Sequence, residues 1–303
     1  MIKKILGLIL VFSAMLAAQG ASFRGAFPDL VPEARGAALG DAAVAMVGDI
    51  NATIWNPAAM TFTTQKGVVG AVNKFQQWPI YLGMFGYVQG MGTRSASALI
   101  WKFLTLKAYD GEARYQEHTI SYAWATQIMP SLGIGIRGKY LMVNSKFNNE
   151  FTGGNAQGFS FDIGATAYGL FGYLNIGLVF KDLGSIIKWQ TGRTEKLPPV
   201  MEFGISTLPI IDRFSFLAAM RAEQGIGLSE LKGGMEIWIF PDIMAIRMGA
   251  IDNLLNKEIH YTVGLGILTG DIFHAYFVNY AYEVNPNEVV GPRHRLSVGL
   301  LWQ

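Results

Sequence analysis

The chain has 303 residues, of which 51% are hydrophobic and only 15% charged, whereas soluble domains usually carry about 25% charged residues. Its 24 basic and 22 acidic residues are scattered and leave a net charge of +2, which excludes the basic surface of a nucleic-acid-binding protein. The chain contains no cysteine, which excludes disulfides, thiolate nucleophiles and cysteine-bound zinc.

The first 20 residues have the pattern of a secretory signal peptide. Lys3 and Lys4 form a basic start, Ile5–Leu16 is an apolar run, and Ala18–Gly20 supplies small residues for cleavage. We expect cleavage after Gly20, and no cysteine follows to make it a lipoprotein signal. The alternative, a membrane anchor, is disfavoured because the apolar run is shorter than the roughly 20 residues that cross a bilayer.

Residues 21–65 are rich in alanine and show no alternation of apolar and polar positions. We expect the stretch Ala34–Val47 to form a short, closely packed helix. Asn56 followed by Pro57 predicts a second helix, since Asn is a good N-cap and Pro suits the first helical position. The whole segment is expected to lie inside the rest of the protein as a plug.

The sequence of residues 66–303 predicts β-strands that face lipid. The chain has 36 glycines, 19 phenylalanines, 12 tyrosines and 7 tryptophans, a mixture poor in helix formers. Apolar positions alternate with period two, as in 132–140, where the even positions apart from Gly138 are large and apolar and the odd ones are glycine or basic. Small residues and single charges on the second face suit the lumen of a closed barrel.

We expect fourteen strands, an even number that lets both ends of the barrel lie on the same side. Closure of the barrel removes the unpaired edge that lipid would not tolerate. The expected strands span residues 67–75, 79–89, 94–104, 114–128, 131–144, 158–169, 173–181, 199–208, 212–223, 230–239, 243–252, 258–268, 272–283 and 293–302.

The connections between these strands alternate in length. Six are tight turns, and five of the seven others are longer and more polar, as bacterial barrels have short periplasmic turns and longer outer loops. The exceptions are 76–78 and 253–257. An uncharged stretch, Ile163–Phe180, would also score as a transmembrane helix, but its glycines and a turn at Gly172 favour a hairpin. The fold class expected is therefore an all-β membrane protein, a transmembrane β-barrel of about 14 antiparallel strands with an N-terminal helical plug.

Charged residues on the predicted inner face form the first candidate site, because Arg or Lys facing lipid at the midplane costs roughly 2–4 kcal/mol. They line either a polar path or a structural network that pairs with Arg35, Asp41 and Asp49 of the plug, and we favour the network. The lumen charges are Arg137, Lys139, Asp162, Lys181, Glu202, Arg221, Glu223, Glu236 and Arg247.

The sequence offers little support for catalysis. Gly133–Gly138 matches GxGxxG but falls within one alternating strand, whereas a dinucleotide site needs a strand before the motif and a helix after it. The four histidines have no metal-ligand spacing, and no Ser, His and acid group is justified as a triad. We therefore expect no enzymatic activity, no catalytic residue, no metal and no cofactor.

Four parts of residues 31–58 carry a family resemblance: Val31–Arg35, Leu39–Ala45, Asp49 and Trp55–Ala58. Together they resemble the N-terminal signature of the PorV/PorQ family, itself similar to FadL-type transporters. The chain departs from that pattern at Glu33, where the family has Asp, in the two residues before Gly40, and in its shorter outer loops. The motif residues carried over are Arg35, Gly40, Asp41, Asp49, Trp55, Asn56 and Pro57.

This resemblance implies an outer-membrane protein of the Gram-negative type that takes part in type IX secretion. PorV-like barrels bind the sorting domain of exported proteins and pass these proteins to the surface attachment machinery. The implied partners are exported cargo proteins and the secretion machinery, in addition to the outer-membrane lipid that the expected barrel requires, and the scattered charge argues against nucleic acid. The alternative is a FadL-like channel for fatty acids or other small hydrophobic molecules, which would need a continuous apolar passage past the plug.

Overall fold

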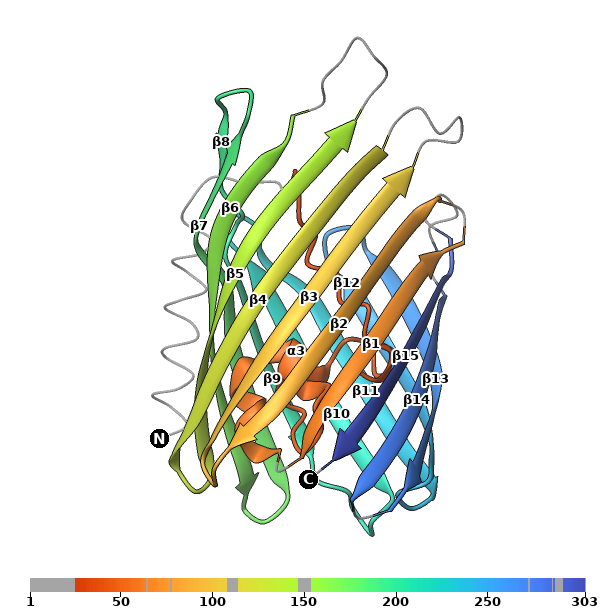
Figure 1. Ribbon diagram of the computed structural model, residues 1–303. Coiled ribbons are helices and arrows are strands. Elements are labelled where there is room, and N and C mark those ends of the chain that lie inside the picture. The colour runs from red at the N-terminus through yellow and green to blue at the C-terminus, as the bar shows by residue number, and fades with distance from the viewer. Residues whose placement is uncertain are drawn as a thin grey trace.

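A computed structural model describes residues 25–302 apart from 64, 77, 108–113, 147–153, 272, 285 and 287–290. The expected signal peptide, residues 1–20, lies outside this described part of the chain. Fourteen long strands form one closed antiparallel sheet around four short helical segments (Figure 1). No helix within the described ranges is both long enough and apolar enough to cross a membrane.

The strands follow one another around the barrel in chain order. Their bounds are β1 Lys66–Phe75, β2 Ile80–Met91, β3 Ser95–Lys107, β4 Arg114–Met129, β5 Leu132–Lys146, β6 Ala156–Leu170, β7 Leu174–Trp189, β8 Thr194–Glu195, β9 Val200–Thr207, β10 Phe214–Glu223, β11 Gly227–Phe240, β12 Met244–Asn253, β13 Glu258–Gly270, β14 His274–Val284 and β15 Arg293–Trp302. The two-residue strand β8 pairs only with the end of β7 and stands outside the ring.

Pairing between the first and last strands closes the barrel. Strand β1 pairs with β15 from Lys66↔Trp302 to Phe75↔Arg293, while β6 pairs with β7 and β7 with β9. Closure leaves no edge with unpaired backbone groups, which a bilayer would not tolerate. The fourteen-stranded barrel predicted from alternation is confirmed, and the uncharged stretch Ile163–Phe180 forms parts of β6 and β7 instead of a helix.

The two faces of the sheet differ as lipid and lumen require. Large apolar side chains are exposed around the outside, among them Tyr122, Ile136 and Phe161, each more than half exposed. Their sequence neighbours are small or polar and buried inside, as Arg137 is beside Ile136. Because the interior is already filled by the plug and by the inward-facing side chains of the wall, the exposed apolar belt has only hydrocarbon to face.

Strand β7 is longer than the pattern predicts. We expected it to end at residue 181, with a loop over 182–198, but it runs to Trp189. Two register shifts against β6 lie in this stretch, and Asp182 and Gly184 have positive φ values of 58° and 59°. Each bulge reverses the alternation of side chains, which hides the strand from a period-two reading. Both Lys181 and Asp182 consequently point inward and are buried.

The two ends of the barrel are different. Short turns connect the strands at one end, which we assign to the periplasm, and the longer connections lie at the other. Strands β3–β7 rise beyond β12–β15 at the long-connection end, so one wall of the barrel is taller (Figure 1).

The N-terminal segment forms the plug. It contains helix α2 (Ala34–Ala38), the 3₁₀ helix η1 (Ala43–Ala45), helix α3 (Ala52–Trp55) and the 3₁₀ helix η2 (Pro57–Phe62). The single helix expected over Ala34–Val47 is wrong, because the chain turns at Gly40 and Asp41, with φ values of 66° and 55°. The start at Asn56 is as expected, since its side chain accepts a hydrogen bond from Ala58 N at 3.0 Å.

Candidate functional site: a plugged lumen

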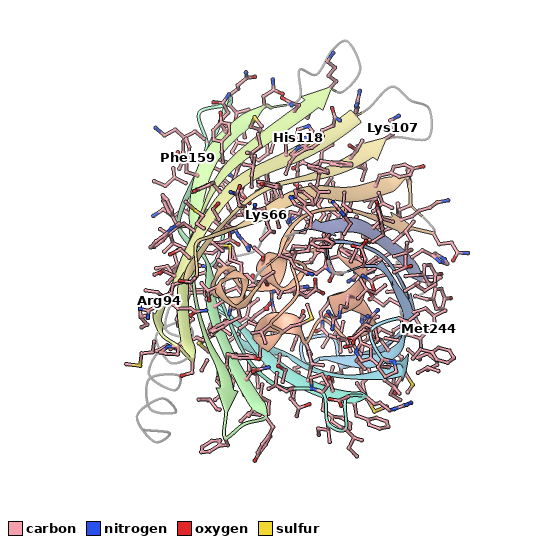
Figure 2. The ribbon with its side chains drawn as sticks, turned by 60° about the horizontal axis from the view of Figure 1, so that its bottom comes forward. Lys66, Arg94, Lys107, His118, Phe159 and Met244 are labelled. Atoms are coloured by element: carbon pink, nitrogen blue, oxygen red, sulfur yellow. The ribbon has the colours of Figure 1, made fainter. Side chains whose placement is uncertain are left out.

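The plug lies directly against the barrel wall because the wall offers glycine where the two meet. A Cβ atom on Gly249 would clash with the backbone of Gly40, and one on Gly177 with the carbonyl of Val44. Figure 2 shows the short helices within the ring of strands. The small residues of the inner face thus allow the backbone of the plug to approach the backbone of the wall. The glycines whose missing side chains make room for the plug include Gly133, Gly135, Gly164, Gly177, Gly204, Gly234, Gly249 and Gly264.

A fully buried carboxylate, Glu33, organises the start of helix α2. It accepts hydrogen bonds from the backbone N–H groups of Arg35 and Gly36, at 2.5 Å and 2.7 Å, and from Trp55 Nε1 at 3.2 Å. Ser297 of β15 donates a longer bond of 3.4 Å to the same group. Burial raises the pKa of Glu33 above its ordinary value, although the two backbone donors act in the opposite direction.

Arg35 ties the plug to β11 by a bidentate ion pair. Its Nη2 lies 2.8 Å from Glu236 Oε1, its Nε donates to Glu236 Oε2 at 3.0 Å, and its Nη1 lies 2.5 Å from Asp49. Glu236 also binds Arg247 of the next strand, at 2.5 Å. Burial alone would lower the pKa of Arg35, but the two carboxylates raise it above its ordinary value. The guanidinium therefore stays charged at any pH that the barrel meets.

Asp41 makes a second link, to the last strand. Its carboxylate lies 2.9 Å from Arg295 Nη1, and Arg295 also binds Glu283 of β14 at 2.8 Å. Burial raises the pKa of Asp41 although Arg295 lowers it. The turn that breaks the expected helix therefore also directs this side chain at the wall.

Asp29 makes a third link, nearer the loop end. It lies 2.6 Å from Arg221 and 3.2 Å from Lys181, and both cations also bind Glu202, at 3.0 Å and 3.2 Å. Arg221 reaches Glu223 as well, at 3.4 Å. One aspartate of the plug thus joins two cations that come from β7 and β10.

Strand β5 provides the fourth link. Arg137 donates to the carbonyl oxygens of Ile54, at 3.1 Å, and Thr53 at the end of helix α3. Lys139 lies between two carboxylates, 2.6 Å from Asp162 and 2.5 Å from Asp182. Asp182 reaches this position because the bulge in β7 turns it inward.

Asn56 fixes the last turn of the plug with neutral hydrogen bonds. Besides capping helix η2, its amide donates to Val44 O, Ala165 O and Thr166 Oγ1, each at 3.1 Å. These acceptors belong to the plug itself and to strand β6. A single buried side chain therefore joins η1, η2 and the wall.

The structure places all nine predicted lumen charges inside the barrel, but their partners differ in part from those we expected. Arg35 does pair with a predicted wall residue, whereas Asp49 pairs with Arg35 and Asp41 with a wall residue outside our set. Arg295 was recognisable, because it lies on the polar face of the last alternating strand. Sequence reasoning also missed Asp29, Glu33, Asp182, Lys232, Glu283 and Arg293.

Two cavities lie on opposite sides of the plug. The cavity nearer the turns has a volume of about 320 Å³ and is lined by residues that include Arg35, Asp49 and Asp242. The cavity nearer the loops has a volume of about 230 Å³ and is lined by residues that include Asp29 and Asp41. They share no lining residue, and charged side chains border both. Residues of the plug line both cavities.

No group of three or more His, Asp or Glu side chains that could hold a metal ion occurs among the residues whose positions are described. Glu236, Glu202 and Glu283 of the lumen are instead held by Arg and Lys at ion-pair distance. The arrangement therefore has a structural role: buried, dehydrated ion pairs hold the plug in place inside the barrel.

Several solved structures are similar to this chain in fold. The CymD monoaromatic hydrocarbon channel is similar over 86% of this chain and 94% of that chain, with a TM-score of 0.61 and 12% identity. A Pseudomonas aeruginosa FadL homologue covers 87% and 96%, with a TM-score of 0.60 and 11% identity. The Pseudomonas putida toluene transporter TodX covers 88% and 96%, with a TM-score of 0.59 and 11% identity. At these identities the likeness establishes the fold alone.

No protein with a curated description matches the sequence. A family model does match: the one described as type IX secretion system protein PorV covers residues 22–221, which is more than half of the chain and includes the plug and the strands through most of β10. The chain belongs to the PorV family of type IX secretion system proteins and has the fold of a FadL-like outer-membrane β-barrel.

Proposed function

We propose that the protein is a non-enzymatic scaffold of protein export, in which the barrel anchors a surface that binds exported cargo or passes it to other secretion components. Residues 1–20 serve as the signal peptide that directs export of the chain from the cytoplasm. The observation that carries the proposal is the set of ion pairs between plug and wall, because Arg35, Asp41 and Asp29 each bind a different part of the barrel. A lumen fixed in this way favours a role for the rim and outer loops.

The second candidate is a channel for small hydrophobic molecules, which the fold of the monoaromatic hydrocarbon channels favours. An apolar solute would have to pass charged groups such as Arg35 and Glu236 and displace their partners. Leaving a buried charge without its partner costs several kcal/mol. The charged borders of both cavities therefore support the scaffold over the channel.

Photocrosslinking in cells that export type IX cargo tests the scaffold directly. A crosslinking amino acid at Thr191, exposed in the β7–β8 connection, should capture cargo or a secretion component. The same amino acid at Ile211, 80% exposed in a turn at the other end, is the matched control and should capture neither. Equal capture from both positions, or from neither, contradicts the proposal.

Proteoliposomes separate the two candidates. The purified chain should add no uptake of toluene or of a fatty acid above that of empty vesicles, while heat-modifiable gel migration shows that the barrel is folded. Uptake that rises with the amount of folded protein would favour the channel.

A further inference from the structure

The outer face of the tall wall changes in a regular way from apolar to cationic. One row across four strands contains Trp101, Ile120, Tyr140 and Phe159, which are direct cross-strand neighbours. These side chains face outward, with Trp101 44% and Phe159 59% exposed. Four residues further toward the loops, a second row on the same face consists of small or amide side chains, Thr105, Gln116 and Asn144, again in direct register.

The last row on this face is entirely basic. Lys107 pairs with Arg114, and Arg114 pairs with Lys146, so three cations stand side by side on β3, β4 and β5. All three are exposed, and Lys107 lies on the outside of the wall beyond His118 (Figure 2). None of the three forms an ion pair with a carboxylate of the described residues. Like charges directly opposite each other in a sheet repel, and an anion that bridges them would remove the repulsion.

A groove lies beside this basic row. It has a volume of about 760 Å³ and lies over β5, β6 and β7, beside the place where the register of β7 against β6 shifts. Gly184, exposed at the bulge, leaves open space where a side chain would stand. The groove combines apolar and polar lining, with Met142, Phe159, Phe161 and Ile186 on one hand and Asn144 and Lys188 on the other.

The height of the three cations above the membrane interface indicates which kind of anion they bind. Lys107 follows Trp101 by six residues, which is about 20 Å along a strand and about 15 Å in height at the usual barrel tilt. The headgroup layer of a phospholipid is only about 5–8 Å thick per leaflet. If the tryptophan marks the interface, the cations stand too high for a phospholipid phosphate. They are at the level of phosphates on a larger saccharide headgroup.

We propose that the outer face of β3–β7 is a binding site for a phosphorylated glycolipid of the outer leaflet. Phosphate groups bridge Lys107, Arg114 and Lys146, the amide row binds sugar hydroxyls, and an acyl chain lies in the groove over Phe159 and Ile186. The site is on the outside of the barrel and is independent of the state of the lumen, so it stands whether the protein proves to be a scaffold or a channel.

Native mass spectrometry of the full chain in detergent tests the site with a diphosphoryl, acylated glucosamine disaccharide as the probe. The variant K107Q/R114Q/K146Q should bind this lipid at least tenfold more weakly than the parent. The control variant R94Q/R213Q/K257Q removes three cations from elsewhere on the rims and should bind like the parent. Equal affinities of parent and triple variant, or an equal loss in the control, overturn the proposal.

Further probes identify the part of the lipid that is recognised. The dephosphorylated lipid, phosphatidylglycerol and inorganic phosphate should each bind the parent at least tenfold more weakly than the diphosphoryl lipid. The variant F159S/I186S should bind the acylated probe more weakly but leave binding of the deacylated headgroup unchanged. Tight binding of phosphatidylglycerol or inorganic phosphate would contradict the glycolipid assignment. Crosslinking from the basic row in cells that yields only a protein, and no glycolipid, would contradict it as well.

The repulsion among Lys107, Arg114 and Lys146 can also be tested without any ligand. Without lipid, K107Q/R114Q/K146Q should raise the midpoint of thermal unfolding relative to the parent, and added glycolipid should raise the midpoint of the parent only. If the triple variant does not fold, R114Q alone removes the central cation and should show the same two directions. A lower midpoint in folded R114Q would mean that the row is stabilised within the protein and needs no anion.

Discussion

Replacing Arg35 with Met should loosen the plug. Arg35→Met removes the charge that binds Glu236 and Asp49 and keeps most of the side-chain length. Removing one partner of a buried pair costs about 3–5 kcal/mol. The lower end applies here, because Glu236 keeps Arg247 at 2.5 Å and Asp49 keeps the amide of Asn51 at 2.9 Å. A loss of about 3 kcal/mol raises the population with a displaced plug about a hundredfold, at 1.4 kcal/mol per factor of ten.

Single-channel recording in planar bilayers measures this population as the fraction of time that the barrel conducts. Arg35→Met should open far more often than the parent, while Arg213→Met, in an exposed turn at the periplasmic end, should not. The double variant Arg35→Met with Asp49→Asn removes the stranded carboxylate of the plug and should recover part of the closure. An open fraction and an unfolding midpoint unchanged by Arg35→Met would refute the reasoning.

Three more substitutions test the plug by thermal unfolding of the purified barrel. Gly249→Ala would clash with Gly40 and should destabilise the folded barrel by about 1–3 kcal/mol. The control Gly70→Ala meets open space and should stabilise the barrel slightly. Equal effects of the two substitutions would contradict backbone contact between plug and wall. Asn56→Ala should cost about 2 kcal/mol through the lost cap and buried acceptors, and no loss would remove its joining role. Burial raises the pKa of Glu33, so its contribution to stability is full below about pH 4.3 and is lost as pH rises through the higher folded value. The advantage of the parent over Glu33→Gln should therefore shrink from acid to neutral pH, and a constant difference would argue against it.

The barrel was predictable because lipid imposes one rule on every strand. Every second side chain must be apolar, so the alternation identified all fourteen strands. Their even number agreed with a closed antiparallel barrel. The second half of β7 escaped this reading, because Asp182 and Gly184 adopt positive φ values and bulges interrupt the period there. A bulge changes the face on which a side chain lies without any mark in hydrophobicity.

The partners inside the lumen were only partly predictable. Alternation predicts which face of the sheet a charged side chain occupies, but not its position along the barrel axis. The ion-pair partner of that side chain depends on both. Asp29 binds cations 152 and 192 residues away in sequence, and no local pattern links them. The family motif marks Glu33 only as a departure from Asp, whereas in the structure Glu33 is the buried N-cap of helix α2.

Backbone shape accounts for the remaining difference. Ala34–Val47 is rich in alanine, which favours a continuous helix. The close approach of Gly40 to Gly233 and Ala250 imposes a left-handed turn instead, and the short helices on either side then pack against the wall. Tertiary contact overrides local helix propensity here, which a reading of the segment alone would not reveal.

Locking the plug tests the central claim most directly, because the parent chain has no cysteine and one added pair is the only thiol chemistry present. Ala34→Cys with Ser297→Cys places a disulfide where Ala34 N now donates to Ser297 Oγ at 3.2 Å. The measurement is the rate of cargo export in cells, compared between oxidised and reduced protein, with bond formation checked by mass spectrometry. A scaffold with a permanently closed lumen predicts equal rates in both states. A rate that falls on oxidation and recovers on reduction would show that the plug must move and would contradict the account.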